Sequence, residues 1–389
     1  MNLDFHYYAT YCAACLAGYT PEEAADISYA AAMVDNCTAT YLQSVNGPEY
    51  AATTQTNAEL ATFSMNALNR QLITRIWSSF HFLPKDLKAE LPGKPKGYMN
   101  KYRLIAGPNG ELVKKTVEQA QQNGHFAAIG IAMHVLADTW AHANFAGTPS
   151  LVINNTNFHF YEVLEEDGKT VDKQMKFIHS LGAPDDLEQS TYVNTLYQPT
   201  EYSIMSLGHG RAGHLPDYSF VKYKYLPAWG QYEEILKDNP SDYWCAFRQM
   251  VYALKWLRNP ENGFELNTYD ETAVEPYREK INAIINKRQP SSDEDWKALG
   301  KEISGVELVE FDKNKYNEAY MNAPRREQDT TYLGEFFNAA MDQKNMVTES
   351  ICDTGNMIAG LNIKINGKNF ETLDDLIAVF GMLKGGKMR

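Results

Sequence analysis

The chain has 389 residues, a net charge of −13 and 44% apolar side chains. These values are typical of a globular protein with a sizeable core, and the acidic balance argues against non-specific nucleic-acid binding, which needs a basic surface. Five cysteines, an odd number, argue against a complete disulfide framework. No signal-peptide pattern is seen and no apolar stretch reaches membrane-spanning length, so we expect a cytoplasmic protein. No particular oligomeric state is expected.

Helical patterns dominate the first 150 residues. An alanine-rich helix is expected over 4–17, and Thr20-Pro-Glu-Glu23 predicts a capping box that opens a second helix, which ends at about Asp35. Residues 84–110 are rich in Pro, Gly and Lys and indicate an exposed loop. Hydrophobic periodicity predicts three more helices, at 57–80, 111–122 and 125–144.

After residue 150 the pattern becomes irregular. Residues 158–163 are compatible with an extended segment, and the glycine-rich stretch 207–217 predicts a loop with close backbone approaches. A small hairpin with an Asn-Gly turn is expected at 363–370. Later helices are expected at 241–258, 271–287, 291–300 and 329–350. We therefore predict a mainly α protein, with a helical domain over 1–260 and a helical carboxy-terminal extension over 261–389 that packs on it, or a single domain.

The most informative feature is a polar stripe within an apolar helix. His134, Asp138 and His142 are spaced four residues apart, so on a helix they share one face. Two imidazoles and a carboxylate on a buried face are costly unless something pairs with them. A divalent metal would pair with all three, because His nitrogens and carboxylate oxygens are its ordinary ligands. A hydrogen-bonded network without a metal is the alternative.

Other titratable residues could join this stripe. His6 lies at the start of the first helix, and His81 lies between aromatic residues. Asp35 lies at the carboxy-terminal end of the second helix, where the helix dipole disfavours an anion, so a nearby cation would compensate its charge. A structural role is open for each of them. The glycine-rich bend adds further candidates, which are His209, His214 and Asp217 as ligands and Arg211 as a residue that holds an anion.

Several common catalytic motifs are absent from the sequence. There is no H-E-x-x-H, no His-Asp dipeptide, no G-x-x-x-x-G-K-[ST] and no G-x-S-x-G. The sequence thus offers no starting point for a zincin, an HD phosphohydrolase, a P-loop nucleotide site or a serine nucleophile.

At residues 125–145 the sequence resembles the zinc-dependent phospholipase C and P1 nuclease superfamily. That resemblance implies an all-helical orthogonal bundle in which His134 and Asp138 are ligands from the central helix and Asp138 bridges two metals. By order along the chain, it implies that His6, Asp35 and His81 are ligands too, that His142 is the additional His, and that His209 or His214, with Asp217, completes the set.

The chain also resembles, over roughly its first 220 residues, an uncharacterised bacterial family with Asp-Phe-His-Tyr-Tyr near its start and Gly-His-Gly-Arg-Ala-Gly-His-Leu-Pro-Asp later. The chain departs from the zinc enzymes in two ways. His6 lies five residues from the first residue, and His214-Leu-Pro-Asp217 replaces a late His-x-x-x-Glu. We therefore expect one or two metal ions, zinc first, with manganese or iron as alternatives.

The leading functional hypothesis is a metal-dependent hydrolase of small-molecule or lipid phosphoesters. Metal-activated water would attack the ester, Asp4 or Asp35 would act as general base, and Arg211 would hold the substrate anion. Hydrolysis of an amide or another ester is also open. The alternative from another class is a helical binding or structural protein with a structural metal site on the same scaffold.

Overall fold

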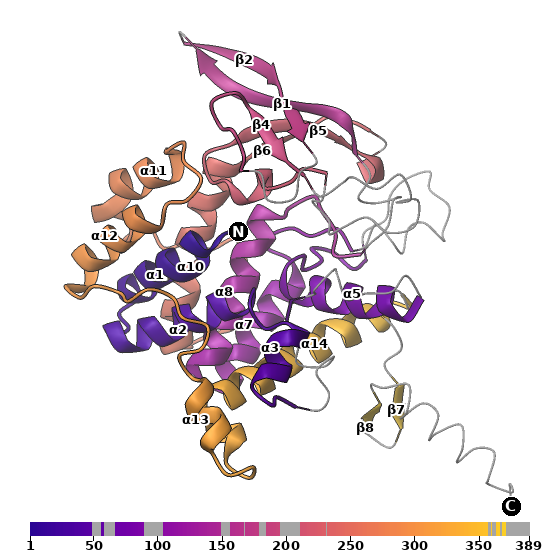
Figure 1. Cartoon of the computed structure of the whole chain (residues 1–389), viewed down its shortest axis with the longest axis vertical. Coiled ribbons are helices and arrows are strands. Elements are labelled where there is room, and N and C mark those ends of the chain that lie inside the picture. Colours follow the sequence, from indigo (N-terminus) through magenta and orange to yellow (C-terminus); the bar gives the residue numbers. More distant parts are fainter. Residues whose placement is uncertain are drawn as a thin grey trace, which may run out of the picture.

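A computed structural model shows helices in the body of the molecule and a sheet at one end (Figure 1). It describes residues 1–48, 56–57, 67–88, 104–148, 156–166, 168–178, 184–194, 211–230, 232–356, 359, 363–365 and 368–370.

Helix α8 (Phe126–Ala141) is the centre of the helical body. Every residue from 127 to 141 is buried, which fits a helix that is apolar on all sides. The helices that contact it most extensively are α2 (Pro21–Met33), α7 (Glu111–Asn123), α10 (Asn239–Arg258) and α14 (Tyr332–Cys352). Polar groups carried by α8 are therefore forced into the core.

The amino-terminal segment is helical, as predicted, but its first turn and a half is a π-helix. This element, η1 (Asp4–Ala9), continues into α1 (Thr10–Leu16). The capping box before α2 is confirmed, because the Glu23 amide donates to the Thr20 hydroxyl and the Glu23 carboxylate accepts from the Thr20 amide. The short helix α3 (Ala39–Ser44) was not expected, and α5 (Ala67–Phe80) falls within the predicted 57–80.

The later helices also pack onto the body. Helices α11 (Arg278–Asn286) and α12 (Asp293–Ser304) follow α10, and α12 contacts η1 and α1. After α13 (Asn317–Asn322), α14 contacts α5, α7 and α8. The division of the chain at residue 260 stays a prediction. None of the described helices is long and apolar enough to cross a membrane.

The prediction of a mainly α fold is wrong, because the structure is mixed α/β. Four antiparallel strands lie in the order β2-β1-β5-β6, and β3 and β4 form a parallel pair. The predicted hairpin is confirmed as the antiparallel pair β7–β8. The strands are β1 (Thr156–Glu166), β2 (Lys169–Gln174), β3 (Lys176–Ile178), β4 (Thr191–Val193), β5 (Lys222–Pro227), β6 (Ile235–Asp238), β7 (Ile363–Ile365) and β8 (Lys368–Phe370).

The expected extended segment 158–163 lies within β1, but β2 to β6 were not predicted, and charged residues occupy much of β2 and β5. In β2 five of six residues are exposed, so no apolar run marks the strand. In β5 buried Tyr223 and Tyr225 alternate with half-buried Lys222 and Lys224, which is the period-two signal of a half-buried strand.

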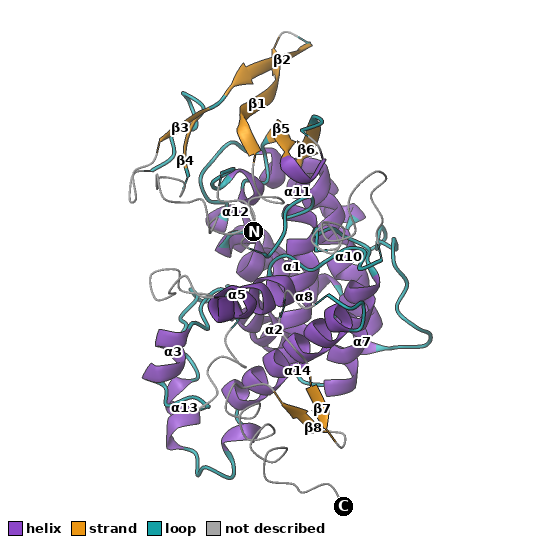
Figure 2. Ribbon diagram, turned by 90° about the vertical axis from the view of Figure 1, so that its right-hand side faces the viewer, coloured by secondary structure: helices purple, strands orange, loops and turns teal. Residues whose placement is uncertain are grey.

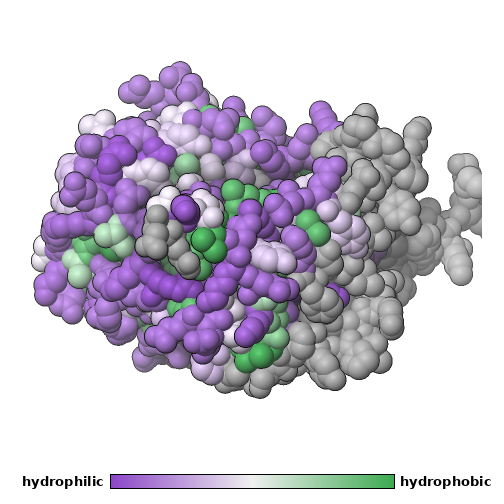
Figure 3. Space-filling model, turned by 90° about the horizontal axis from the view of Figure 1, so that it is seen from above, coloured by the Kyte–Doolittle hydropathy of each residue, from purple (hydrophilic) through white to green (hydrophobic). Residues whose placement is uncertain are grey.

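The sheet is attached to the carboxy-terminal end of α8. The Trp229 indole donates to the Asn144 carbonyl at 2.9 Å, and the buried Lys237 ammonium donates to the Trp140 carbonyl at 2.8 Å. Figure 2 shows strands β1 to β6 at one end of the helical body, with the first residue near the junction, and β7 and β8 at the other end. On the face seen in Figure 3, from above, hydrophobic residues form small separate patches among hydrophilic ones.

Gly130 tests the close packing of α8 on α2. A Cβ at Gly130 would lie 2.2 Å from the Ile27 carbonyl oxygen, whereas one at Gly300 would meet only side chains, the Tyr11 ring at 3.0 Å and the Cys12 sulfur at 3.4 Å, among its nearest neighbours. We expect Gly130→Ala to destabilise the protein by about 3 kcal/mol through overpacking, and Gly300→Ala by about 1 kcal/mol or less. Urea unfolding measures both. Equal effects would contradict the backbone contact between α8 and α2.

Candidate metal centre

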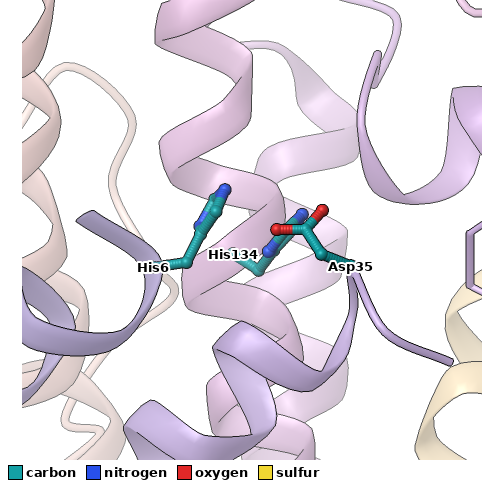
Figure 4. A group of neighbouring side chains, drawn as sticks. All are labelled: His6, Asp35 and His134. Carbon is teal, nitrogen blue, oxygen red and sulfur yellow. The ribbon is translucent and has the colours of Figure 1, made fainter. Parts of the chain in front are cut away.

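The predicted stripe faces a cluster of buried polar side chains. His134 and Asp138 lie on α8, and His142 is the first residue after it. Their exposed fractions are 0%, 1% and 4%. Figure 4 shows His6 and Asp35, from two other segments, converging on His134. The ligand atoms of these three residues lie within 4.8 Å of one another.

Three atoms form a nearly equilateral triangle at the centre of the cluster. His134 Nε2 and His81 Nδ1 are 3.3 Å apart, and each lies 3.2 Å from Asp138 Oδ2. A regular tetrahedron with edges of this length has its centre about 2.0 Å from each corner, which matches zinc–nitrogen and zinc–oxygen bonds. The triangle thus has the size of one face of a tetrahedral zinc site.

The opposite nitrogen of each ring is fixed by a backbone carbonyl. His134 Nδ1 lies 2.9 Å from the Ala31 oxygen, and His81 Nε2 lies 3.0 Å from the Thr56 oxygen. His142 Nδ1 lies 2.7 Å from the His81 oxygen. A carbonyl can only accept, so these nitrogens carry the protons. The other nitrogens of neutral rings are therefore left with lone pairs, as in metal-binding His residues.

The other oxygen of Asp138 faces a second group of residues. Asp138 Oδ1 lies 2.7 Å from the amino group of Met1 and 3.2 Å from His6 Nε2. Asp217 Oδ1 lies 3.2 Å from the same amino group and 3.3 Å from His142 Nε2. Apart from this approach to Asp138, neither ring nitrogen of the fully buried His6 has a hydrogen-bond partner within the described chain. Two carboxylates and an orphaned imidazole thus surround one ammonium group.

Burial and charge perturb the protonation of the cluster in opposite directions. Burial, and next the neighbouring His134, lower the pKa of His6 to about 4. Burial would raise the pKa of Asp138, but His142, the Met1 ammonium and the other imidazoles hold it well below its usual range. Burial would lower the pKa of His81, yet Asp138 and Asp35 raise it. Near neutral pH, His6 and Asp138 are deprotonated, as metal binding requires.

The amino group of Met1 stays charged under the same conditions. Burial alone would lower its pKa, but Asp138, Asp217 and Asp35 raise it to about 11. The amino group is therefore positively charged near neutral pH, with three carboxylates close to it.

The cluster opens into a small pocket. Its volume is about 130 Å³, roughly that of four water molecules in the liquid. Asp35, whose side chain is 37% exposed, connects it to the surface. No Lys or Arg belongs to the described lining, which consists of Met1, Asp35, Asn57, Trp77, His81, Phe82, Asp138, His142 and Asp217.

The other residues named from the sequence lie elsewhere. The carboxylate of Asp4 accepts hydrogen bonds from the Phe5 and Ser292 amides, and burial raises its pKa to about 6. His214 is exposed and pairs with Asp185 at 3.3 Å. Arg211 is half-buried, and its carbonyl accepts from Asn194. None of the three lines the pocket, and His209 lies outside the described residues.

Two partners of the cluster could not be recognised from the sequence. The Met1 partner is its main-chain amino group, and the Thr56 partner is its main-chain carbonyl. Neither has a residue-type signature. Asp217, by contrast, was found because it follows the conspicuous glycine-rich bend.

The neutral His6 makes a testable contribution to stability. The pKa of His6 in the folded protein is about 4, below the ordinary 6.5. Below pH 6.5 the unfolded chain therefore binds more protons than the folded one, and the free energy of unfolding decreases as the pH is lowered. In chelator, the advantage of wild type over His6→Gln should shrink by about 2 kcal/mol between pH 7 and pH 5. Urea unfolding of both proteins at the two pH values measures it, and a pH-independent difference would contradict the buried neutral ring.

One family model, described as a family of unknown function (DUF6765), matches residues 1–351. This match extends beyond the first 220 residues or so that the sequence motifs suggest. No curated protein and no solved structure matches the chain, so the resemblance to the zinc-dependent phospholipase C and P1 nuclease superfamily remains a hypothesis. Because the family model covers most of the chain, the protein belongs to this family of unknown function.

Proposed function

We propose that the protein is a metal-dependent hydrolase, with zinc as the metal and phosphoesters as the substrates. The observation that carries the proposal is the triangle of His81, His134 and Asp138. The ring nitrogen of each imidazole that faces away from the triangle is hydrogen-bonded to a backbone carbonyl, which orients the ring. Three acceptor atoms at 3.2–3.3 Å are stable only around a shared cation. That cation is a proton on His81 or a metal ion.

The residues of the triangle would hold the first ion, with Asp35 next to them at 3.8 Å from His81 Nδ1. A bound ion of this kind acidifies its water and stabilises negative charge on a phosphoryl oxygen. Asp138 offers its second oxygen, Oδ1, to the other group, where His6 Nε2, His142 Nε2 and the Asp217 carboxylate are the available ligand atoms. One or two ions therefore fit the donor set.

Asp35 is the residue we assign as general base. Its side chain is the most exposed of the cluster carboxylates, at 37%, and it lines the pocket. It can therefore reach both an incoming water and the solvent. Asp138, at 1% exposure, is committed to its buried partners and is suited to holding metal.

The size of the pocket supports the proposal that only a small charged group of the substrate enters it. Its volume of about 130 Å³ suits a phosphoryl group. Because the described lining has three carboxylates and only the Met1 amino group as a cation, the bound metal would have to neutralise most of the substrate's charge. This requirement couples substrate binding to metal binding.

A structural role for the cluster is the second candidate, and one observation favours it. The ammonium of Met1 already pairs with both Asp138 and Asp217, so part of the negative charge of the second group is balanced without an ion. A single closed metal site, or a proton-bridged network, could then stabilise the fold without turnover.

Metal content distinguishes a metal centre from a hydrogen-bond network. We expect the purified protein to retain at least one equivalent of zinc after dialysis and His134→Ala to lose it, because the variant removes one corner of the triangle. His159→Ala, which changes a half-buried histidine on strand β1, is the matched control. Mass spectrometry measures the zinc content of the wild type and of both variants. A wild-type protein that stays free of zinc even after incubation with the metal would refute the metal centre.

Asp35→Asn separates catalysis from structure. The amide keeps the shape of the side chain but cannot act as a base, so we expect zinc content to persist while hydrolysis of a chromogenic phosphodiester falls at least about a hundredfold. Substrate screening with Zn²⁺ and Mn²⁺ on wild type comes first. Unchanged turnover in the variant would remove Asp35 from the mechanism, and a fully inactive, zinc-loaded wild type would favour the structural role.

A further inference from the structure

Asp217 lies on a very short element that is held by side chains of α10. The element is the 3-10 helix η3 (Leu215–Asp217), which has only one turn. The Asn239 amide group donates to the Leu215 carbonyl at 2.7 Å and to the Tyr218 carbonyl at 2.8 Å. The Tyr243 hydroxyl donates to the Pro216 carbonyl at 3.2 Å. Both side chains are buried, so these bonds are shielded from water.

Tyr243 also contacts the other side of the cluster. Its ring packs edge-on against Phe5, with centroids 4.9 Å apart. Phe5 precedes His6 in η1, and Pro216 precedes Asp217 in η3. One side chain of α10 therefore touches the residue before each of two members of the cluster.

The carboxylate and the backbone of Asp217 are held by different partners. The carboxylate faces the Met1 ammonium at 3.2 Å and His142 Nε2 at 3.3 Å. The backbone lies in a single turn of 3-10 helix, which has few internal hydrogen bonds of its own. The contacts from α10 supply the missing restraint.

We infer that Tyr243, assisted by Asn239, is a positioning residue that holds Asp217 beside His142 and the Met1 amino group, where the second ion of the metal centre would bind. This inference rests on the proposed metal-dependent function and adds to it residues that touch neither metal nor substrate. The buried hydroxyl of Tyr243 is thereby assigned a role in metal affinity beyond its share in packing.

A double-mutant cycle tests the inference. Tyr243→Phe removes the bond to Pro216 and keeps the ring against Phe5. Tyr19→Phe is the matched control, because the Tyr19 hydroxyl also donates to a backbone carbonyl, that of Leu254 at 3.3 Å, and Tyr19 does not line the pocket. Zinc affinity is measured by chelator competition for wild type, both variants, Asp217→Asn, and Tyr243→Phe combined with Asp217→Asn.

We expect Tyr243→Phe to weaken binding of the second zinc equivalent, which Asp217 would help to hold, about tenfold, as loss of a supporting contact does, while Tyr19→Phe has no effect on it. In the Asp217→Asn background the Tyr243→Phe effect should vanish, because the carboxylate that it positions is gone. An unchanged affinity in Tyr243→Phe, or the same tenfold loss with Asp217→Asn present, would overturn the inference.

Hydrogen exchange of the zinc-free protein gives a second readout that needs no metal. The amide of Asp217 donates to the His214 carbonyl at 2.9 Å, and it should exchange faster in Tyr243→Phe than in wild type or Tyr19→Phe. Equal exchange would overturn the inference. Wild type that binds no zinc would instead refute the proposed function, and the exchange measurement would still decide whether Tyr243 orders Asp217.

Discussion

The buried carboxylate of Asp138 is the constraint on which the rest of this structure depends. A carboxylate that is 1% exposed is tolerated only when cations and hydrogen-bond donors surround it. Here its partners come from the amino terminus, from η1, from the end of α5 and from α8 itself. The elements that meet at this point do so because each carries one of those partners.

The scaffold keeps these partners in place through backbone contacts. Close packing at Gly130 brings α2 against α8, and the Ala31 carbonyl of α2 then orients His134. At the other end of α8, Trp229 and Lys237 tie the sheet to the carbonyls of Asn144 and Trp140. The sheet thus buttresses the turn that carries His142.

The cluster was predictable where the signal was local. His134, Asp138 and His142 follow from a four-residue spacing in an apolar helix, and the capping box marks the start of α2. The pairing of His214 with Asp185, 29 residues away, has no local signature. The sheet was missed for a related reason, since charged residues mask β2 and only the alternation around Tyr223 and Tyr225 signals β5.

The central claim is that the triangle of His81, His134 and Asp138 holds a metal ion, and anomalous scattering tests it most directly. Diffraction from zinc-loaded crystals, recorded on either side of the zinc absorption edge, should show a peak about 2.0 Å from His81 Nδ1, His134 Nε2 and Asp138 Oδ2. Density at this position without an anomalous signal, or zinc only at surface histidines such as His159 and His214, would contradict the account.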